Sequence, residues 1–181
     1  MTSIREQRRI RLKNDYQTMV NIKRPWLNYK IISGTIPYIE QYVIDLKLKI
    51  IVGRGPKFTN SHRISIILPA TYPHNSAPQI RYLDSPKPFH PNWFTSGNWC
   101  YGTWLIHESL GEHVIRMIQT LQYDLQITHE GSPANSDANS WFKDNLSNGI
   151  FPSDKTELPD PTVGRMKLSS ELIKKKFIIK G

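Results

Sequence analysis

The sequence predicts an α+β fold in which a helix precedes a small antiparallel sheet and further helices follow it. Alternating apolar residues mark four short strand segments between residues 29 and 83, and helical apolar spacing flanks them on both sides. These segments follow one another too closely for crossover helices, so neighbouring strands should pair as an antiparallel meander. We therefore expect an N-terminal helix, a four-stranded antiparallel meander, an irregular segment around residue 100 and C-terminal helices.

The first helix is predicted over residues 3–22. Its apolar side chains recur at helical spacing, while the arginines lie mostly on other faces; the stripe consists of Leu12, Tyr16, Met19 and Val20. Pro25 ends the segment, because proline disfavours helical backbone in the residue before it.

The four strands are predicted at residues 29–36, 42–52, 62–68 and 79–83. In the second strand the inward positions would be Ile44, Leu46, Leu48 and Ile50. The glycines and proline of residues 53–56 predict a turn after this strand. Residues 68–78 carry three prolines, each of which fixes φ and removes a backbone donor, so a rigid extended loop is expected there.

Two helices are predicted after residue 100. Ser109 and Glu112 have the spacing of a capping box, and an apolar stripe then continues to about residue 127. A shorter helix follows at residues 137–146. We expect residues 1–148 to form one domain and residues 149–181 to form a proline-punctuated linker and a basic tail.

Composition excludes several classes of protein. Cys100 is the only cysteine, which excludes an internal disulfide framework and a cysteine-rich zinc site and fits a reducing compartment. The basic N-terminal residues precede no apolar run, so no secretory signal is predicted. No stretch approaches the roughly 20 apolar residues of a membrane span. We expect a cytoplasmic protein without membrane contact, metal or cofactor.

The net charge of +9 is concentrated at the two ends of the chain. Residues 1–24 carry seven basic and two acidic side chains, and residues 164–181 carry six basic and one acidic. Such ends could bind nucleic acid or an acidic protein, or could simply be solvated. Trp93, Trp99 and Trp104 could stack on bases, but they lie in the near-neutral middle, so nucleic acid ranks last as a partner.

The most informative stretch is residues 89–100. His90-Pro91-Asn92 is followed by four residues, then by Gly97, and then by Cys100. A lone cysteine is most often a small buried hydrophobe. This arrangement nevertheless resembles the active-site signature of the ubiquitin-conjugating enzyme family. The Tyr72-Pro73 pair in its proline-rich loop, and the residues 132–141 that lead into an aromatic helix, also resemble that family.

The resemblance extends from about residue 8 to residue 146 and implies the ubiquitin-conjugating-enzyme fold. It implies that Cys100 accepts a ubiquitin-like modifier as a thioester from an activating enzyme and passes it to an amine, usually a target lysine. Asn92 would donate to the oxyanion or organise the loop. The active-site loop would be supported by His90, Pro91, Gly97, Tyr101 and Ser132.

The sequence departs from the family at several points. Tyr101-Gly102 follows the cysteine where eukaryotic members usually have leucine. The acidic residue that many members carry near the site has no clear match and would fall at Gly131 or Ser132, with Glu130 nearby, which leaves the activation of the acceptor amine open. His74 replaces a phenylalanine that many members present, which argues against docking to a RING-type ligase. The divergence resembles bacterial stand-alone members found in conjugation operons, some linked to antiviral defence.

Family resemblance also suggests partner-binding residues. The first helix of the family contributes to binding the activating enzyme, which would involve Arg5, Arg8, Arg9 and Arg11 here. Tyr72, His74 and Trp104 lie at the partner loops. The alternative for the arginines is a solvated helix face.

Two rival functions remain at the level of sequence. The chain could be a non-catalytic module that only binds a ubiquitin-like protein, although such modules typically lack the cysteine. It could also be a basic nucleic-acid-binding protein. Other thiol chemistries fit less well, because there is no Cys-x-x-Cys pair and nothing fixes His107 or His113 as a protease-like partner of Cys100.

Overall fold

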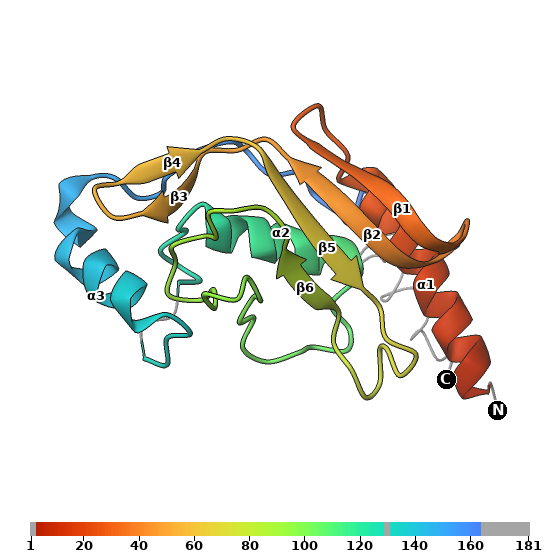
Figure 1. Ribbon diagram of the computed structural model, residues 1–181. Helices are drawn as coiled ribbons and strands as arrows, with labels where there is room; N and C mark the ends of the chain where they lie inside the picture. Colours follow the sequence, from red (N-terminus) through yellow and green to blue (C-terminus); the bar gives the residue numbers. More distant parts are fainter. Residues whose placement is uncertain (1–2, 129–130, 164–181) are drawn as a thin grey trace, which may run out of the picture.

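The computed structural model describes residues 3–128 and 131–163. It has the predicted α+β order of helix, antiparallel sheet, irregular segment and helices (Figure 1). The four-stranded sheet and helix α1 lie at one end of the molecule, and helix α3 and a small hairpin lie at the other. None of the helices in the described ranges is long and apolar enough to cross a membrane.

Helix α1 spans Ile4–Asn21, as predicted. Its first turn is capped by the Ser3 hydroxyl, which accepts a hydrogen bond from the Glu6 amide at 3.2 Å. The buried face differs from the expected stripe, because Asp15 and Thr18 are buried whereas Val20 is 39% exposed. Asp15 can be buried because Arg11 on the same helix and two groups from other parts of the fold satisfy its carboxylate, as described below.

The main sheet confirms the predicted meander. Strands β1 (Leu27–Thr35), β2 (Tyr38–Leu46), β5 (His62–Ile67) and β6 (Gln79–Tyr82) lie in the order β1-β2-β5-β6, and every pair is antiparallel. In the register, Ile44 is opposite Ile64, and Ile64 is opposite Tyr82. All three are buried, so one face of the sheet is apolar across its inner strands.

The single strand predicted at residues 42–52 is wrong, because it is two strands in two sheets. After β2 ends at Leu46, β3 (Ile50–Gly53) forms a separate hairpin with β4 (Lys57–Thr59), which the sequence did not predict. At the break, the Leu48 carbonyl lies 2.8 Å from His62 Nε2, and the Lys49 amide donates to Asp154 at 2.7 Å. Leu48 is buried, so the predicted alternation of inward-facing residues continues through the break.

Helices α1 and α2 (Leu110–Leu121) pack with the sheet around one core. The two helices approach closely at Gly111, whose amide donates to the Thr18 hydroxyl at 3.0 Å. A Cβ at residue 111 would lie 2.8 Å from Thr18 Cβ, so this crossing needs glycine. The core consists of Leu12, Met19, Tyr42, Ile44, Leu46, Ile64, Ile66, Tyr82, Val114, Met117, Ile118 and other buried residues.

Helix α2 begins as predicted but ends earlier. Ser109 and Glu112 form the predicted capping box. The helix ends at Leu121 rather than near residue 127, because Tyr123 adopts a left-handed φ of 60°. Leu125, expected in the apolar stripe, is consequently 54% exposed.

A second, aromatic cluster fills the other end of the molecule. The cluster is formed by Ile51, Tyr123, Phe142 and Phe151. It anchors α3 (Ser136–Asp144), which confirms the predicted third helix, and a short 3-10 turn at Leu146–Asn148 follows.

Residues 149–163, the first part of the predicted linker, run along the body. The Ser153 amide donates to the Gln122 carbonyl at 2.7 Å, and the Asn21 side chain donates to the Pro161 carbonyl at 3.1 Å. The predicted basic tail, residues 164–181, lies outside the described residues. The domain boundary at residue 148 stays a prediction.

Candidate active site

The segment that leads to Cys100 docks on the end of the sheet. The Gly97 carbonyl accepts from the Tyr82 amide of β6, and the Gly97 amide donates to the Phe94 carbonyl, both at 2.8 Å. Gly97 has φ +90°, and a Cβ there would lie 2.9 Å from the Tyr82 oxygen. Glycine is required at this position because both the backbone conformation and the space exclude a side chain.

His90 holds the turn that precedes this segment. Its ring is buried, Nδ1 accepts from the Asn92 amide at 2.9 Å, and the ring lies 4.1 Å from that of Tyr123. Burial lowers the pKa of His90 to about 3. The imidazole is therefore neutral with its proton on Nε2, which suits a scaffold role rather than that of a general base.

The carbonyl of Pro91 ties this turn to the segment before α3. It accepts from the amides of Ala134 at 2.7 Å and Asn135 at 3.2 Å. Asn135 is also the N-cap of α3, with its side chain accepting from the Ala138 amide at 3.0 Å. This link places Ser132, exposed and just ahead of the cap, beside the cysteine segment.

Cys100 and Asn92 are joined through their backbones and share one recess. The Cys100 amide donates to the Asn92 carbonyl at 2.8 Å. Both residues line a small cavity of about 100 Å³ and an adjoining open cavity of about 620 Å³. The open cavity is lined by Asn92, Cys100, Tyr101, Gly102, Thr103, Arg116, Gly131 and Ser132. Cys100 is a half-buried free cysteine that lines both cavities.

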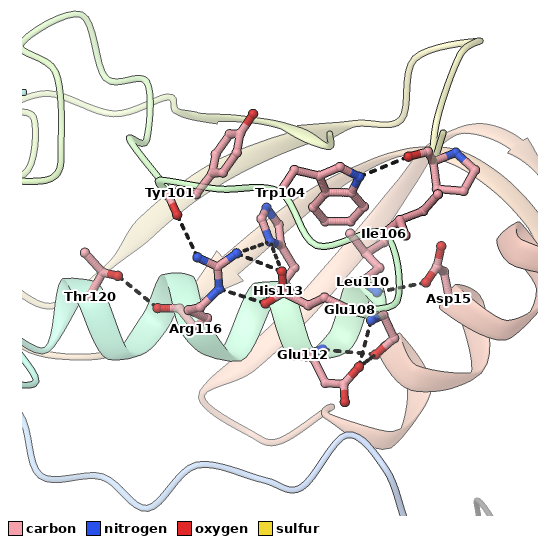
Figure 2. A network of polar contacts seen from close by, with 12 residues as sticks. Asp15, Tyr101, Trp104, Ile106, Glu108, Leu110, Glu112, His113, Arg116 and Thr120 are labelled. Atoms are coloured by element: carbon pink, nitrogen blue, oxygen red, sulfur yellow. Dashed lines mark hydrogen bonds and ion pairs between the residues drawn. The ribbon is translucent and has the colours of Figure 1, made fainter. Parts of the chain in front are cut away.

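Beside this site, Arg116 of α2 forms an ion pair with Glu108, which directly precedes the N-cap Ser109 (Figure 2). Arg116 Nε and Nη2 each lie 2.7 Å from a different oxygen of Glu108, and Nη1 donates to the Tyr101 carbonyl at 2.7 Å. Burial opposes ionisation of Glu108, but its bonds from His113 and Arg116 outweigh this and lower its pKa to about 2.

His113 belongs to the same network, in which its Nδ1 lies 3.0 Å from Glu108 (Figure 2). Its ring packs against those of Trp99 and Trp104, with ring centres 4.9 and 5.1 Å apart. Burial lowers its pKa, although Glu108 opposes that shift. His107 is exposed.

The predicted partner-loop residues lie away from both cavities that Cys100 lines. Tyr72 is buried, and its hydroxyl donates to Asp15 at 2.6 Å. The Trp104 indole donates to the Pro73 carbonyl at 3.0 Å, and Trp104 is half-buried. His74 is exposed on the proline-rich loop.

The four arginines of α1 divide into two pairs. Arg8 lies 2.8 Å from Glu40, and Arg11 lies 2.9 Å from Asp15 and stacks near Trp104, so both make contacts within the fold. Arg5 and Arg9 are exposed, and Arg9 lies over the Tyr38 ring. Any partner contact by α1 would be made mainly by this second pair.

The structure thus gathers Cys100, Asn92, Tyr101 and Ser132 at one recess, with His90, Pro91 and Gly97 supporting it. Sequence reasoning missed Arg116 and Glu108. The available signal was the arginine that interrupts the apolar stripe of α2 between Val114 and Met117. Within the described ranges no cluster of His, Cys, Asp or Glu could hold a metal ion.

No protein-family model and no curated protein sequence matches this chain. Among solved structures, the chain is similar to Ubc12 of S. cerevisiae, with 20% sequence identity and a TM-score of 0.53. The match covers 80% of this chain and 74% of that one. The similarity confirms the predicted ubiquitin-conjugating-enzyme fold.

Proposed function

We propose that this protein is a conjugating enzyme for a ubiquitin-like modifier, which it carries as a thioester on Cys100. The observation that carries the proposal is the recess in which Cys100 and Asn92 lie together, on a fold shared with Ubc12. The Cys100 amide is bonded to the Asn92 carbonyl, so the nucleophile and the proposed oxyanion donor are held in one backbone frame.

In the first step, the Cys100 thiolate attacks the thioester carbonyl carbon that joins the modifier to the activating enzyme. The new carbon–sulfur bond forms as the old one breaks, and the activating-enzyme cysteine leaves as a thiolate. In the second step an acceptor amine, for which we propose a target lysine, attacks the new thioester. A carbon–nitrogen bond forms, the amine loses a proton, and Cys100 leaves as a thiolate.

Asn92 would act in both steps, because each passes through a tetrahedral species with a negatively charged oxygen. A neutral amide donor placed at such an oxygen contributes about 3–4 kcal/mol in other enzymes. The open cavity of about 620 Å³ beside Cys100 would admit the modifier's C-terminus and the acceptor. Among the described residues that line this cavity none carries a carboxylate, and Glu130, which precedes Gly131 in the sequence, lies outside the described residues.

The direct test combines the protein with its cognate activating enzyme, modifier and ATP. Wild type should form an adduct that is cleaved by excess thiol. Cys100→Ser should give a thiol-resistant ester or no adduct, and Cys100→Ala should give none. A wild type that binds the modifier but never forms the adduct would instead favour the non-catalytic binding module.

The bacterial and cytoplasmic setting and the expected lack of docking to a RING-type ligase stay parts of this proposal. Genes for an activating enzyme and a ubiquitin-like protein beside this one would support that setting. A salt-sensitive shift of generic DNA or RNA at physiological ionic strength would support nucleic-acid binding instead.

A further inference from the structure

Both sequence neighbours of Cys100 contact the same side chain of α2. Arg116 donates to the Tyr101 carbonyl at 2.7 Å, and its guanidinium carbon lies 5.3 Å from the centre of the Trp99 ring. Arg116 also lines both cavities that Cys100 lines. The guanidinium therefore touches the chain immediately before and immediately after the thiol.

Arg116 is itself held in one orientation. Glu108 accepts from Nε and Nη2 through its two oxygens, each at 2.7 Å, in the bidentate geometry that fixes a planar guanidinium. The Glu108 and Arg116 side chains are only 10% and 27% exposed. His113, one turn before Arg116 on the same helix, adds a third contact to Glu108 at 3.0 Å. We call the Glu108–Arg116 pair, together with the bond from Arg116 to the Tyr101 carbonyl, the clamp. The clamp joins helix α2 to the loop that carries Cys100.

We propose that Arg116 is a positioning residue for Cys100, which orders the Trp99–Tyr101 segment so that the thiol stays in register with Asn92. This inference rests on the proposed function. Together with the bond from the Cys100 amide to Asn92, the clamp fixes three consecutive residues around the nucleophile. A nucleophile that loses such ordering spends less time in a reactive geometry, which lowers the rate of the chemical step.

Replacement of Arg116 should have a local effect, unlike replacement of a residue that supports the whole fold. Helix α2 is held by its capping box and by the buried Val114, Met117 and Ile118, none of which involves Arg116. Loss of the guanidinium should therefore loosen residues 99–103 more than the sheet.

Hydrogen–deuterium exchange on the full chain tests this ordering without any activity assay. In Arg116→Met, amide exchange in peptides covering residues 99–103 should rise by on the order of tenfold, since a charge-assisted bond to Tyr101 is lost. Peptides from β2 should be unchanged. Arg63→Met is the matched control, because it removes an arginine paired with Asp84 at 2.6 Å on the exposed face of β5, away from Cys100.

Single-turnover transfer of the modifier to Cys100 tests the consequence. Arg116→Met should lower the rate constant at saturation about tenfold or more, while the activating-enzyme concentration that gives half the maximal rate stays the same. Arg116→Lys should be intermediate, because lysine can donate to the Tyr101 carbonyl but cannot bind Glu108 bidentately. The Arg63→Met control should match wild type.

The two proposals fail separately. If Arg116→Met leaves exchange at residues 99–103 at the wild-type level, or raises it equally in β2, the positioning role is wrong. If Arg116→Met does not fold, the comparison is made with Arg116→Lys, in which exchange should rise at residues 99–103 by less than in the Met variant but by more than in β2. No rise, or an equal rise in β2, would make the positioning role wrong. If wild type never accepts the modifier, the proposed function fails, while the exchange pattern still decides whether Arg116 orders the cysteine segment.

Discussion

Loss of the Asn92 side chain should most clearly distinguish an effect on the reaction rate from an effect on folding. Its backbone already holds the Cys100 amide, so Asn92→Ala keeps that bond while removing the amide donor. We expect transfer from Cys100 to an amine to slow about 10²–10³-fold. The measurement is single-turnover discharge of the thioester. Asn98→Ala, an exposed asparagine on the same loop, should discharge at the wild-type rate; an equally fast Asn92→Ala would contradict the oxyanion role.

Asp15 is the residue on which the junction of α1, the proline-rich loop and α2 depends. Its fully buried carboxylate accepts from Arg11, from the Tyr72 hydroxyl at 2.6 Å and from the Leu110 amide at 2.8 Å. Burial raises its pKa even though these partners oppose the shift. Each of its two oxygens accepts from Arg11 and from one further donor, and these hydrogen bonds offset the cost of burying the carboxyl group.

Removal of this carboxylate should be strongly destabilising. Asp15→Ala leaves three donors buried without it, and we expect a loss of about 3–5 kcal/mol in the free energy of unfolding. Tyr72→Phe removes one donor and should cost about 1.5–3 kcal/mol. Urea denaturation provides both values. If Asp15→Ala lowers the free energy of unfolding by less than Tyr72→Phe does, the junction does not depend on the carboxylate.

At the scale of elements, the α1–α2 crossing depends on one missing side chain. Gly111→Ala would place a methyl group 2.8 Å from Thr18 Cβ and 3.0 Å from Pro161 Cβ. We expect a loss of about 1–3 kcal/mol in unfolding free energy from this overpacking. Gly53→Ala is the control, since its Cβ would meet only the flexible Lys57 side chain at an ordinary 3.4 Å. Chemical denaturation should show no comparable loss for that variant.

Element boundaries were predictable where local chemistry fixes them. The start of α2 followed from Ser109 and Glu112, whose side chains satisfy the helix's own first amides. The break between β2 and β3 was not predictable, because it depends on His62 and Asp154, which bind backbone groups of residues 48 and 49 from elsewhere in the chain. The alternation of apolar residues continues through the break and gives no sign of it.

At the scale of the whole molecule, stability should fall on acidification. Burial lowers the pKa of His90 to about 3 and also lowers that of His62 and His113. At these three histidines the unfolded chain therefore binds more protons than the folded protein below a pH of about 6.5, whereas Asp15, whose pKa is raised, acts in the opposite direction. For His90 alone, stability should be full above pH 6.5 and should decrease by up to about 1.4 kcal/mol per pH unit toward pH 3.

Glu108 adds to this loss at lower pH. Its pKa is about 2 in the folded protein and about 4.5 in the unfolded chain, so the stability that it contributes is lost as the pH falls through that range. Thermal unfolding between pH 8 and pH 4 measures the slope. His90→Gln removes the titrating group and should flatten the slope between pH 6.5 and 4.5. An unchanged slope in that variant would mean that the other buried histidines account for it.

Residues 149–163 test how far the folded body extends. Phe151 is 9% exposed within the aromatic cluster, and its ring lies 4.7 Å from that of Tyr123. A chain ending at residue 148 loses this packing and that of Leu158 against the main core. We expect it to unfold at least about 3 kcal/mol more easily than a chain ending at residue 163. Equal denaturation midpoints would instead place the end of the domain at residue 148.

The sequence by itself determined the α+β order, the meander, the capped start of α2 and the stretch in which Cys100, Asn92 and Gly97 occur. These follow from local periodicity, local hydrogen bonds and a family motif, all of which are continuous along the chain. Only the tertiary structure decided that Arg116, paired with Glu108, contacts both sequence neighbours of Cys100. It also decided that Asp15 and Tyr72 are buried. Those outcomes depend on contacts between residues up to 95 positions apart, such as Asp15 with Leu110, whose geometry no local pattern specifies.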